Sequence, residues 1–85
     1  MTKPKEQQYI AYQLTGSSDN IPLNCFSTRI VNIGTVGVLI NARILLNVGD
    51  SIDYTADTGC ILKGDVQIRT ATQGTDYIVT VERVQ

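Results

Sequence analysis

The 85-residue sequence contains no histidine and no tryptophan. Without histidine, the chain has no Ser-His or Cys-His pair to activate a nucleophile, no imidazole for acid–base catalysis and no histidine ligand for zinc. No other set of residues in the sequence amounts to a catalytic or metal site. We therefore expect a protein that is not an enzyme and that uses no cofactor, no metal ion and no small-molecule substrate.

Charged residues are also scarce, at 18% of the chain against roughly 25% in ordinary soluble domains. The seven basic side chains are scattered along the sequence and the net charge is -1, so no cationic stripe suited to nucleic acid is present. Apolar residues reach 42%. A surface with so few charges favours burial against other subunits, and we expect a homo-oligomer that does not bind specific nucleic acid.

Long apolar runs are missing as well. None approaches the roughly 18 residues of a membrane span, and the N-terminal stretch MTKPKEQQ lacks the apolar core of a signal peptide. We expect a cytoplasmic origin and no membrane partner. The two cysteines, Cys25 and Cys60, are more often free than paired in a chain without an export signal, and whether these two pair stays open.

The sequence has no stretch with a period of 3.6 residues. Alternating apolar runs recur instead, with turn residues about every 8 to 12 positions. This pattern predicts seven or eight short strands in a small antiparallel β-sandwich, with a small β-barrel as the alternative. Residues 9–85 are expected to form this single domain, and residues 1–8 a flexible or partner-bound N-terminal arm.

The segment 36–48 is expected to be a hairpin at the centre of the scaffold. Its apolar residues are assigned to the core: Val36, Val38, Ile40, Ile44 and Leu46. Gly37 indicates a bulge or a close backbone approach. Further along, residues 60–62 are predicted to be a short strand, and Gly64 is expected to take the positive φ of a tight turn.

The triplet Asp57-Thr58-Gly59 is also the active-site signature of aspartic proteases. The flanking sequence does not fit such an enzyme, because only 26 residues (60 to 85) follow and no glycine-rich flap can be placed in them. A turn in which Gly59 takes a positive φ is the better interpretation. Asp50, Asp53 and Asp57 lie close in sequence and are interpreted as solvated acids rather than calcium ligands, since no D-x-D-x-D-G loop is present.

The segment RIVNIGTVGVLINARILLNVGDSI resembles a recurrent unit of small structural proteins of tailed bacteriophages. That unit has an N-x-G turn, a V-x-V-x-I-N-x-R hairpin, an L-L-x-x-G-[DE]-S-I return and a later V-x-I strand. The matching residues here are Asn32, Gly34, Val36, Val38, Ile40, Asn41, Leu45, Leu46, Gly49, Asp50, Ser51, Ile52, Val66 and Ile68. The resemblance covers roughly residues 29–70, about half of the chain. Ala42 and Val48 depart from it, because glycine is usual after the asparagine and proline before the turn glycine, so the turn type stays open.

The resemblance implies a non-enzymatic virion component, such as a capsid auxiliary or decoration protein or a head–tail or baseplate module, assembled in the host cytoplasm. Its partners would be other virion subunits. The strand pattern leaves five residues outside the core as candidate contacts: Lys3, Lys5, Asn20, Arg43 and Lys63. One alternative is a carbohydrate- or surface-binding sandwich, which would present Tyr9 and Tyr54 side by side. A more remote one is a homodimeric aspartic protease that uses Asp57.

Overall fold

A computed structural model describes residues 8–85 of the chain, and these residues form eight β-strands and no helix. The strands are β1 (Tyr9–Gly16), β2 (Ser18–Pro22), β3 (Ser27–Asn32), β4 (Val38–Ile40), β5 (Ile44–Leu46), β6 (Ser51–Thr55), β7 (Asp65–Thr70) and β8 (Tyr77–Val84). The all-β class is therefore confirmed. Within the described part of the chain, no helix has the length and apolar character needed to cross a membrane.

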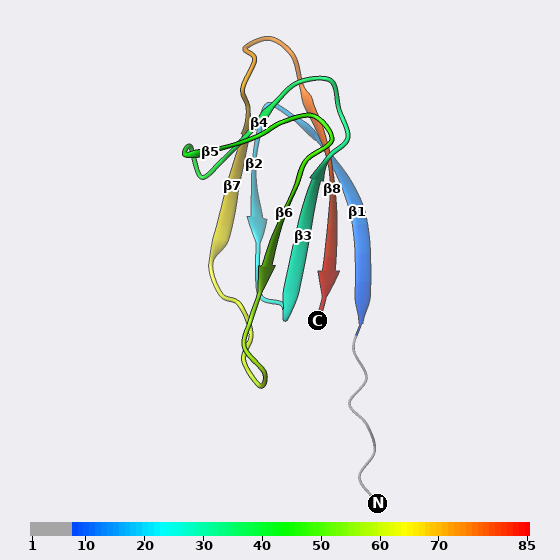
Figure 1. The fold of residues 1–85 in the computed structure, drawn as a ribbon, viewed down its shortest axis with the longest axis vertical. Helices are drawn as coiled ribbons and strands as arrows, with labels where there is room; N and C mark the ends of the chain where they lie inside the picture. Colours follow the sequence, from blue (N-terminus) through cyan, green and yellow to red (C-terminus); the bar gives the residue numbers. More distant parts are fainter. Residues whose placement is uncertain (1–7) are drawn as a thin grey trace, which may run out of the picture.

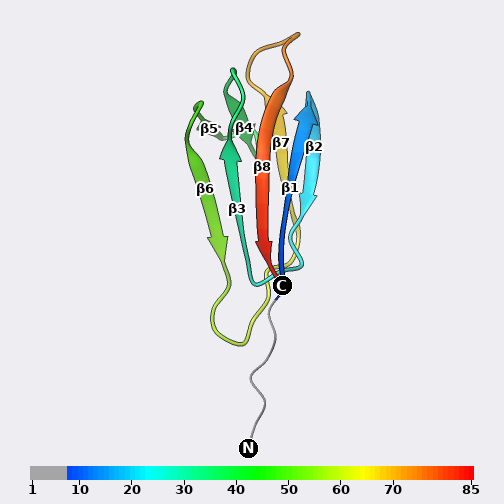
Figure 2. The same cartoon turned by 90° about the vertical axis from the view of Figure 1, so that its right-hand side faces the viewer.

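The strands form two four-stranded antiparallel sheets that pack against each other (Figures 1 and 2). The first sheet has the order β1-β8-β3-β6 and the second β2-β7-β4-β5. The first strand thus pairs with the eighth, the second with the seventh, the third with the sixth and the fourth with the fifth, like one long hairpin wrapped around a core. Eight antiparallel strands wrapped in this way form a jelly roll. The predicted sandwich is confirmed, with two separate sheets instead of the closed barrel.

The core lies between the sheets and is formed by alternate residues of the strands. Its fully buried apolar side chains come from both sheets: Ile21, Ile30, Val38, Ile40, Val66, Ile68, Tyr77, Val79 and Val81. Most are β-branched, a shape that packs well on a pleated surface, and burying each contributes roughly 1.5–3 kcal/mol. Tyr12 and Leu14 of β1 pack against this cluster, as the alternation of the first strand predicts.

Two details of the expected strand pattern are wrong. Ile44 is 48% exposed and does not reach the core, because β5 is a three-residue edge strand in a hairpin that projects from the body of the molecule (Figure 1). Residues 60–62 form no strand and contribute only an isolated bridge between Leu62 and Cys25. Cys25 itself is buried in the core, where it is 1% exposed, and both cysteines are free.

Asn32, at the end of β3, is fully buried and joins two loops through its side chain. Its Nδ2 donates to the carbonyl oxygens of Val36 (2.8 Å) and Leu46 (3.0 Å), and its Oδ1 accepts from Gly34 N (3.1 Å). Its main chain also pairs with the segment that precedes β6, since Asn32 N donates to Asp50 O and Gly49 N to Asn32 O, both over 2.9 Å. Asn32 thus links the loop before β4, the end of β5 and the segment before β6, and we call this meeting point the corner.

Two further polar side chains of β8 bond to β2 and to the residue that follows it. The Tyr77 hydroxyl in β8 donates to Asp19 Oδ2 in β2 over 2.6 Å. Burial, together with this hydrogen bond, raises the pKa of Tyr77 well above its ordinary value. At the opposite end of β8, Arg83 donates from Nη2 to the carbonyl of Leu23.

The pairing of β1 with β8 extends by one residue beyond the strands. Gln8 N donates to Gln85 O (3.2 Å) and Gln85 N to Gln8 O (2.8 Å). Gln8 is the last residue of the expected arm 1–8, and residues 1–7 lie outside the described part of the chain.

Candidate interaction surface

The connection between β4 and β5 spans residues 41–43 and contains a turn built from left-handed backbone conformations. Asn41 and Ala42 have φ angles of 52° and 57°, and Arg43 N donates to Ile40 O over 3.0 Å. Positive φ at both central residues defines a type I′ turn, whose twist matches that of a β-hairpin. Asparagine tolerates this conformation, but alanine pays roughly 1–2 kcal/mol for it. Ala42 therefore keeps the turn type that glycine would favour and leaves strain at the tip of the hairpin.

Asn41 also fastens this turn to the neighbouring strand β7. Its main-chain N donates to Gln67 O over 2.7 Å, and its side-chain Oδ1 accepts from Gln67 N over 2.9 Å. Two short hydrogen bonds to the same residue hold the turn in one position. The hairpin projects from the body of the molecule without being a loose loop.

Apolar side chains are exposed on this hairpin. Ile44 is 48% and Leu45 51% exposed, and Leu39 is half-buried beside them. Leu45 lies over Gly37, where a Cβ atom would come within 2.9 Å of Leu45 Cδ1. Gly37 thus has a close neighbour, but this neighbour is a side chain and not the backbone that was expected. We call the exposed residues of this hairpin together with Leu39 the tip surface, which comprises Leu39, Ala42, Arg43, Ile44 and Leu45.

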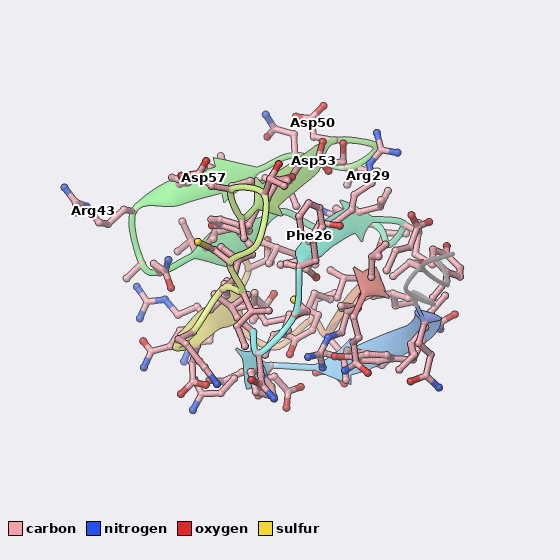
Figure 3. The ribbon with its side chains drawn as sticks, turned by 90° about the horizontal axis from the view of Figure 1, so that it is seen from below. Phe26, Arg29, Arg43, Asp50, Asp53 and Asp57 are labelled. Carbon is pink, nitrogen blue, oxygen red and sulfur yellow. The ribbon has the colours of Figure 1, made fainter. Side chains whose placement is uncertain are left out.

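A hollow of about 300 Å³ adjoins the tip surface on the outer face of the second sheet. Its lining comes from β2, β4, the turn and β7: Ser18, Asn20, Leu39, Ala42, Gln67, Ile68 and Arg69. No acidic side chain lines it. Arg43 points into solvent at the edge of the molecule (Figure 3), and neither Arg43 nor Arg69 belongs to the ion pair found among residues 8–85. The hollow is therefore mainly polar with one cationic side chain, Arg69, and the tip surface is apolar and cationic.

The structure brings two of the five predicted contact residues to this region. Asn20 lines the hollow, and Arg43 belongs to the tip surface. Lys63 lies away from both, in the loop between β6 and β7 at the lower end of the molecule in Figure 1, where its Nζ donates to Asn24 Oδ1 over 2.8 Å. Lys3 and Lys5 lie outside the described residues.

Sequence reasoning missed the apolar part of the tip surface. It assigned Ile44 to the core and gave Leu45 no role. A signal for Leu45 was present, because three successive apolar residues on a strand cannot all face the same side. The exposure of Ile44 had no such signal, since it depends on how far the opposite sheet extends.

A second, smaller hollow of about 170 Å³ lies on the outer face of the first sheet. Tyr9, which is 62% exposed, lines it together with Arg29, Asp53 and Glu82. Arg29 Nε lies 3.2 Å from Asp53 Oδ1, and both side chains are largely exposed (Figure 3). Such a surface ion pair contributes little to stability. The ion pair does place hydrogen-bonding groups beside the aromatic ring of Tyr9.

The other candidate motifs form turns and ordinary strand positions. Asp57 O accepts from Cys60 N over 2.9 Å and Gly59 has a φ of 84°, as expected for a turn at the Asp-Thr-Gly triplet. Tyr54 packs against the core whereas Tyr9 is on the outer face, so these two tyrosines do not share a surface. Among residues 8–85, no three acidic or cysteine side chains are grouped closely enough to hold a metal ion.

The fold and its surfaces thus define a jelly-roll sandwich with one projecting, apolar and cationic hairpin. Comparisons with protein-family models, with curated proteins and with solved structures find no match to this chain. The likeness to phage structural proteins therefore stays a prediction from the sequence.

Proposed function

We propose that this chain is a non-enzymatic structural protein of a phage particle, a small jelly roll that docks on neighbouring subunits of the capsid or tail through its tip surface. The observation that carries the proposal is the β4–β5 hairpin. It presents Ile44 and Leu45, each about half exposed, on a turn that Asn41 fastens to β7.

The chemistry of the tip surface suits a protein partner. Protein interfaces combine an apolar centre with arginine, and lysine and acidic residues are depleted there. Leu45 and Leu39, which pair across β5 and β4, supply the apolar centre with Arg69 beside them, while Ile44 lies on the opposite face of β5. Because the turn is already held in place, little backbone entropy is lost on docking. The matching surface on the neighbour is an apolar patch bordered by carboxylates.

Two further considerations support a virion role. The segment 29–52 resembles a unit of small phage structural proteins, and jelly rolls occur in viral capsid domains. They also occur in lectins, so the topology favours no function by itself. The scarcity of charge, at 18% of residues, favours a protein that works within an assembly.

The composition of purified particles tests the proposal. Phage particles whose genome encodes this chain are purified by banding in a density gradient. Their proteins are then quantified by mass spectrometry. We expect the chain in many copies per particle, in a constant ratio to the major capsid or tail protein. Its absence from particles that carry all other structural proteins would overturn the proposal.

Add-back to particles that lack the chain tests the surface. The purified wild-type protein is expected to sediment with such particles, and the double variant Ile44→Ser with Leu45→Ser to stay in the supernatant. Ile61→Ser is the matched control, because Ile61 is 55% exposed but lies in the β6–β7 loop. Binding by the double variant at the wild-type level would exclude the tip surface as the contact.

A carbohydrate-binding module is the second candidate, and the hollow beside Tyr9 favours it. A single exposed ring with Arg29, Asp53 and Glu82 around it offers a stacking face and hydrogen-bonding groups. A glycan array tests it. Binding that is lost in Tyr9→Ala and retained in Tyr77→Phe would favour this function over the virion role, and an array with no bound glycan would remove it.

A further inference from the structure

Each sheet of the sandwich has two edge strands, and three of these four edges carry features that oppose pairing with another strand. β2 contains the inward-pointing Asp19 and ends at Pro22, β6 carries the charged Asp53, and β5 is only three residues long. Charges, prolines and short strands are the means by which native sheets avoid pairing edge to edge.

β1 has none of these protections. It is an edge strand of eight residues, YIAYQLTG, with no charged residue and no proline. At about 3.4 Å per residue it offers an edge roughly 27 Å long. Figure 1 shows it as the outermost strand on one side of the molecule, with no other described segment beyond it. An edge of this kind is a template for a further strand.

The hydrogen bonds to β8 decide which groups of β1 are free. Gln8 and Gln85 bond to each other in both directions, so they are a hydrogen-bonded pair. Such pairs alternate along an antiparallel ladder. Given the register Tyr9↔Val84, the backbone groups of residues 10, 12 and 14 point toward β8. Those of Tyr9, Ala11, Gln13 and Thr15 therefore point outward, with no strand among residues 8–85 to bond to.

We propose that this edge pairs with β1 of a second copy of the chain, antiparallel and around a twofold axis that passes by Tyr12. The free groups fix the register. Ala11 lies opposite the partner's Gln13, and Tyr9 opposite the partner's Thr15, so that eight backbone hydrogen bonds form, two for each of the four facing pairs. The two first sheets become one continuous eight-stranded sheet.

Both faces of this pairing are self-complementary. On the inner face, Ile10 meets the partner's Leu14 and the two Tyr12 rings meet each other, which covers apolar side chains that are partly exposed in the single chain. Aromatic and aliphatic cross-strand pairs each contribute about 0.2–1 kcal/mol. On the outer face, the facing residues are small or neutral. Because β1 carries no charge, two copies meet without repulsion.

The dimer does not depend on the proposed function, because two chains can pair whether or not they belong to a particle. The contact consists of one strand pair, so it lies at the small end of protein interfaces and is expected to be reversible. Light scattering should therefore give a mass near 9.3 kDa in dilute solution and about twice that value in concentrated solution.

Charged variants at exposed positions test the surface and the register. Ala11→Lys with Gln13→Lys sets like charges opposite each other and should give a monomer at every concentration. Ser51→Lys with Thr55→Lys on the β6 edge is the matched control and should dimerise like the wild type. Ala11→Lys with Gln13→Glu should restore the dimer, because each new lysine faces a carboxylate only in the proposed register.

A wild-type protein that stays monomeric, a dimer that survives the two lysines in β1, or a charge swap that fails to restore pairing would each overturn the proposal. Hydrogen exchange in the unmodified protein gives a measurement that needs no variant. The amides of Ala11 and Gln13 should exchange slowly in concentrated solution and fast after dilution. Fast exchange at both concentrations would contradict the pairing.

Discussion

Replacing Asn32 by alanine should destabilise the protein more than any other single loss of a polar side chain in the described residues. Its amide bonds three main-chain groups, Val36 O, Leu46 O and Gly34 N, from a fully buried position. The variant leaves these groups without their partner, and alanine supplies neither a donor nor an acceptor. The corner that positions β4, β5 and β6 therefore loses its link.

The size of the effect follows from the burial of these bonds. An unsatisfied buried polar group costs about 1–3 kcal/mol. The bonds to Leu46 O and Gly34 N are buried, while the bond to Val36 O is partly buried and water can replace it there. We expect a loss of about 3–4 kcal/mol, a large share of the roughly 4–13 kcal/mol that stabilises a domain of this size.

Urea unfolding followed by far-ultraviolet circular dichroism measures this loss. With a slope of about 1–3 kcal/mol per molar urea, the midpoint should fall by about 2 M at an unchanged slope. Asn47→Ala is the control, because Asn47 is exposed and near Leu46, and it should change stability by less than about 0.5 kcal/mol. Asn32→Asp should lose more than Asn32→Ala at neutral pH, since its carboxylate would face two carbonyl oxygens. A loss below about 1 kcal/mol in Asn32→Ala would refute the reasoning.

Three further changes are expected to alter stability in stated directions. Tyr77→Phe removes the hydrogen bond to Asp19 and should cost about 1.5–3 kcal/mol in urea unfolding, whereas Tyr9→Phe should cost almost nothing. The pKa of Tyr77 is raised in the folded state. Above about pH 10 the tyrosine therefore ionises in the unfolded chain before it ionises in the folded protein. The stability that Tyr77 contributes is complete below this pH and is lost as the pH rises above it. The wild type should therefore weaken from about pH 9 to pH 11 more than Tyr77→Phe does, and equal pH profiles would contradict this. Ala42→Gly relieves the left-handed strain of about 1–2 kcal/mol, but the added conformational entropy of glycine stabilises the unfolded chain by about 0.4–1 kcal/mol. Calorimetry should therefore show a net gain in stability of about 0.5–1 kcal/mol, and a loss of stability would exclude the type I′ turn. Thr28→Val replaces a buried hydroxyl that has no hydrogen-bond partner and should raise the melting temperature by roughly 4–8 °C, whereas a decrease would indicate that the hydroxyl is bonded.

The fold class was predictable from the sequence because alternation of apolar and polar residues has a period of two in any strand. Tyr77, Val79 and Val81 illustrate this, since all three are predicted on one face and all three are fully buried. The order of the strands was not predictable. β1 pairs with β8, at the far end of the chain, and local sequence carries no information about such a distant partner.

The candidate interaction surface was predictable only in its polar part. Asn20 and Arg43 could be assigned to the surface because each breaks or borders an apolar run. Ile44 could not, since its alternation is the same as that of the buried Leu46. Which of the two is covered depends on the extent of the opposite sheet, and that is a property of the complete fold.

Five of the residues that carry the resemblance to phage proteins meet at one corner of the structure: Asn32, Gly34, Leu46, Gly49 and Asp50. Asn32 bonds Gly34 N and Leu46 O through its side chain, and Gly49 N and Asp50 O through its main chain. These five residues help to form the corner, whereas Ile44 and Arg69 of the proposed docking region are not among the matching residues. The tests of partner choice therefore rest on Ile44, Leu45 and the edge of β1, and variants of the shared corner report on folding.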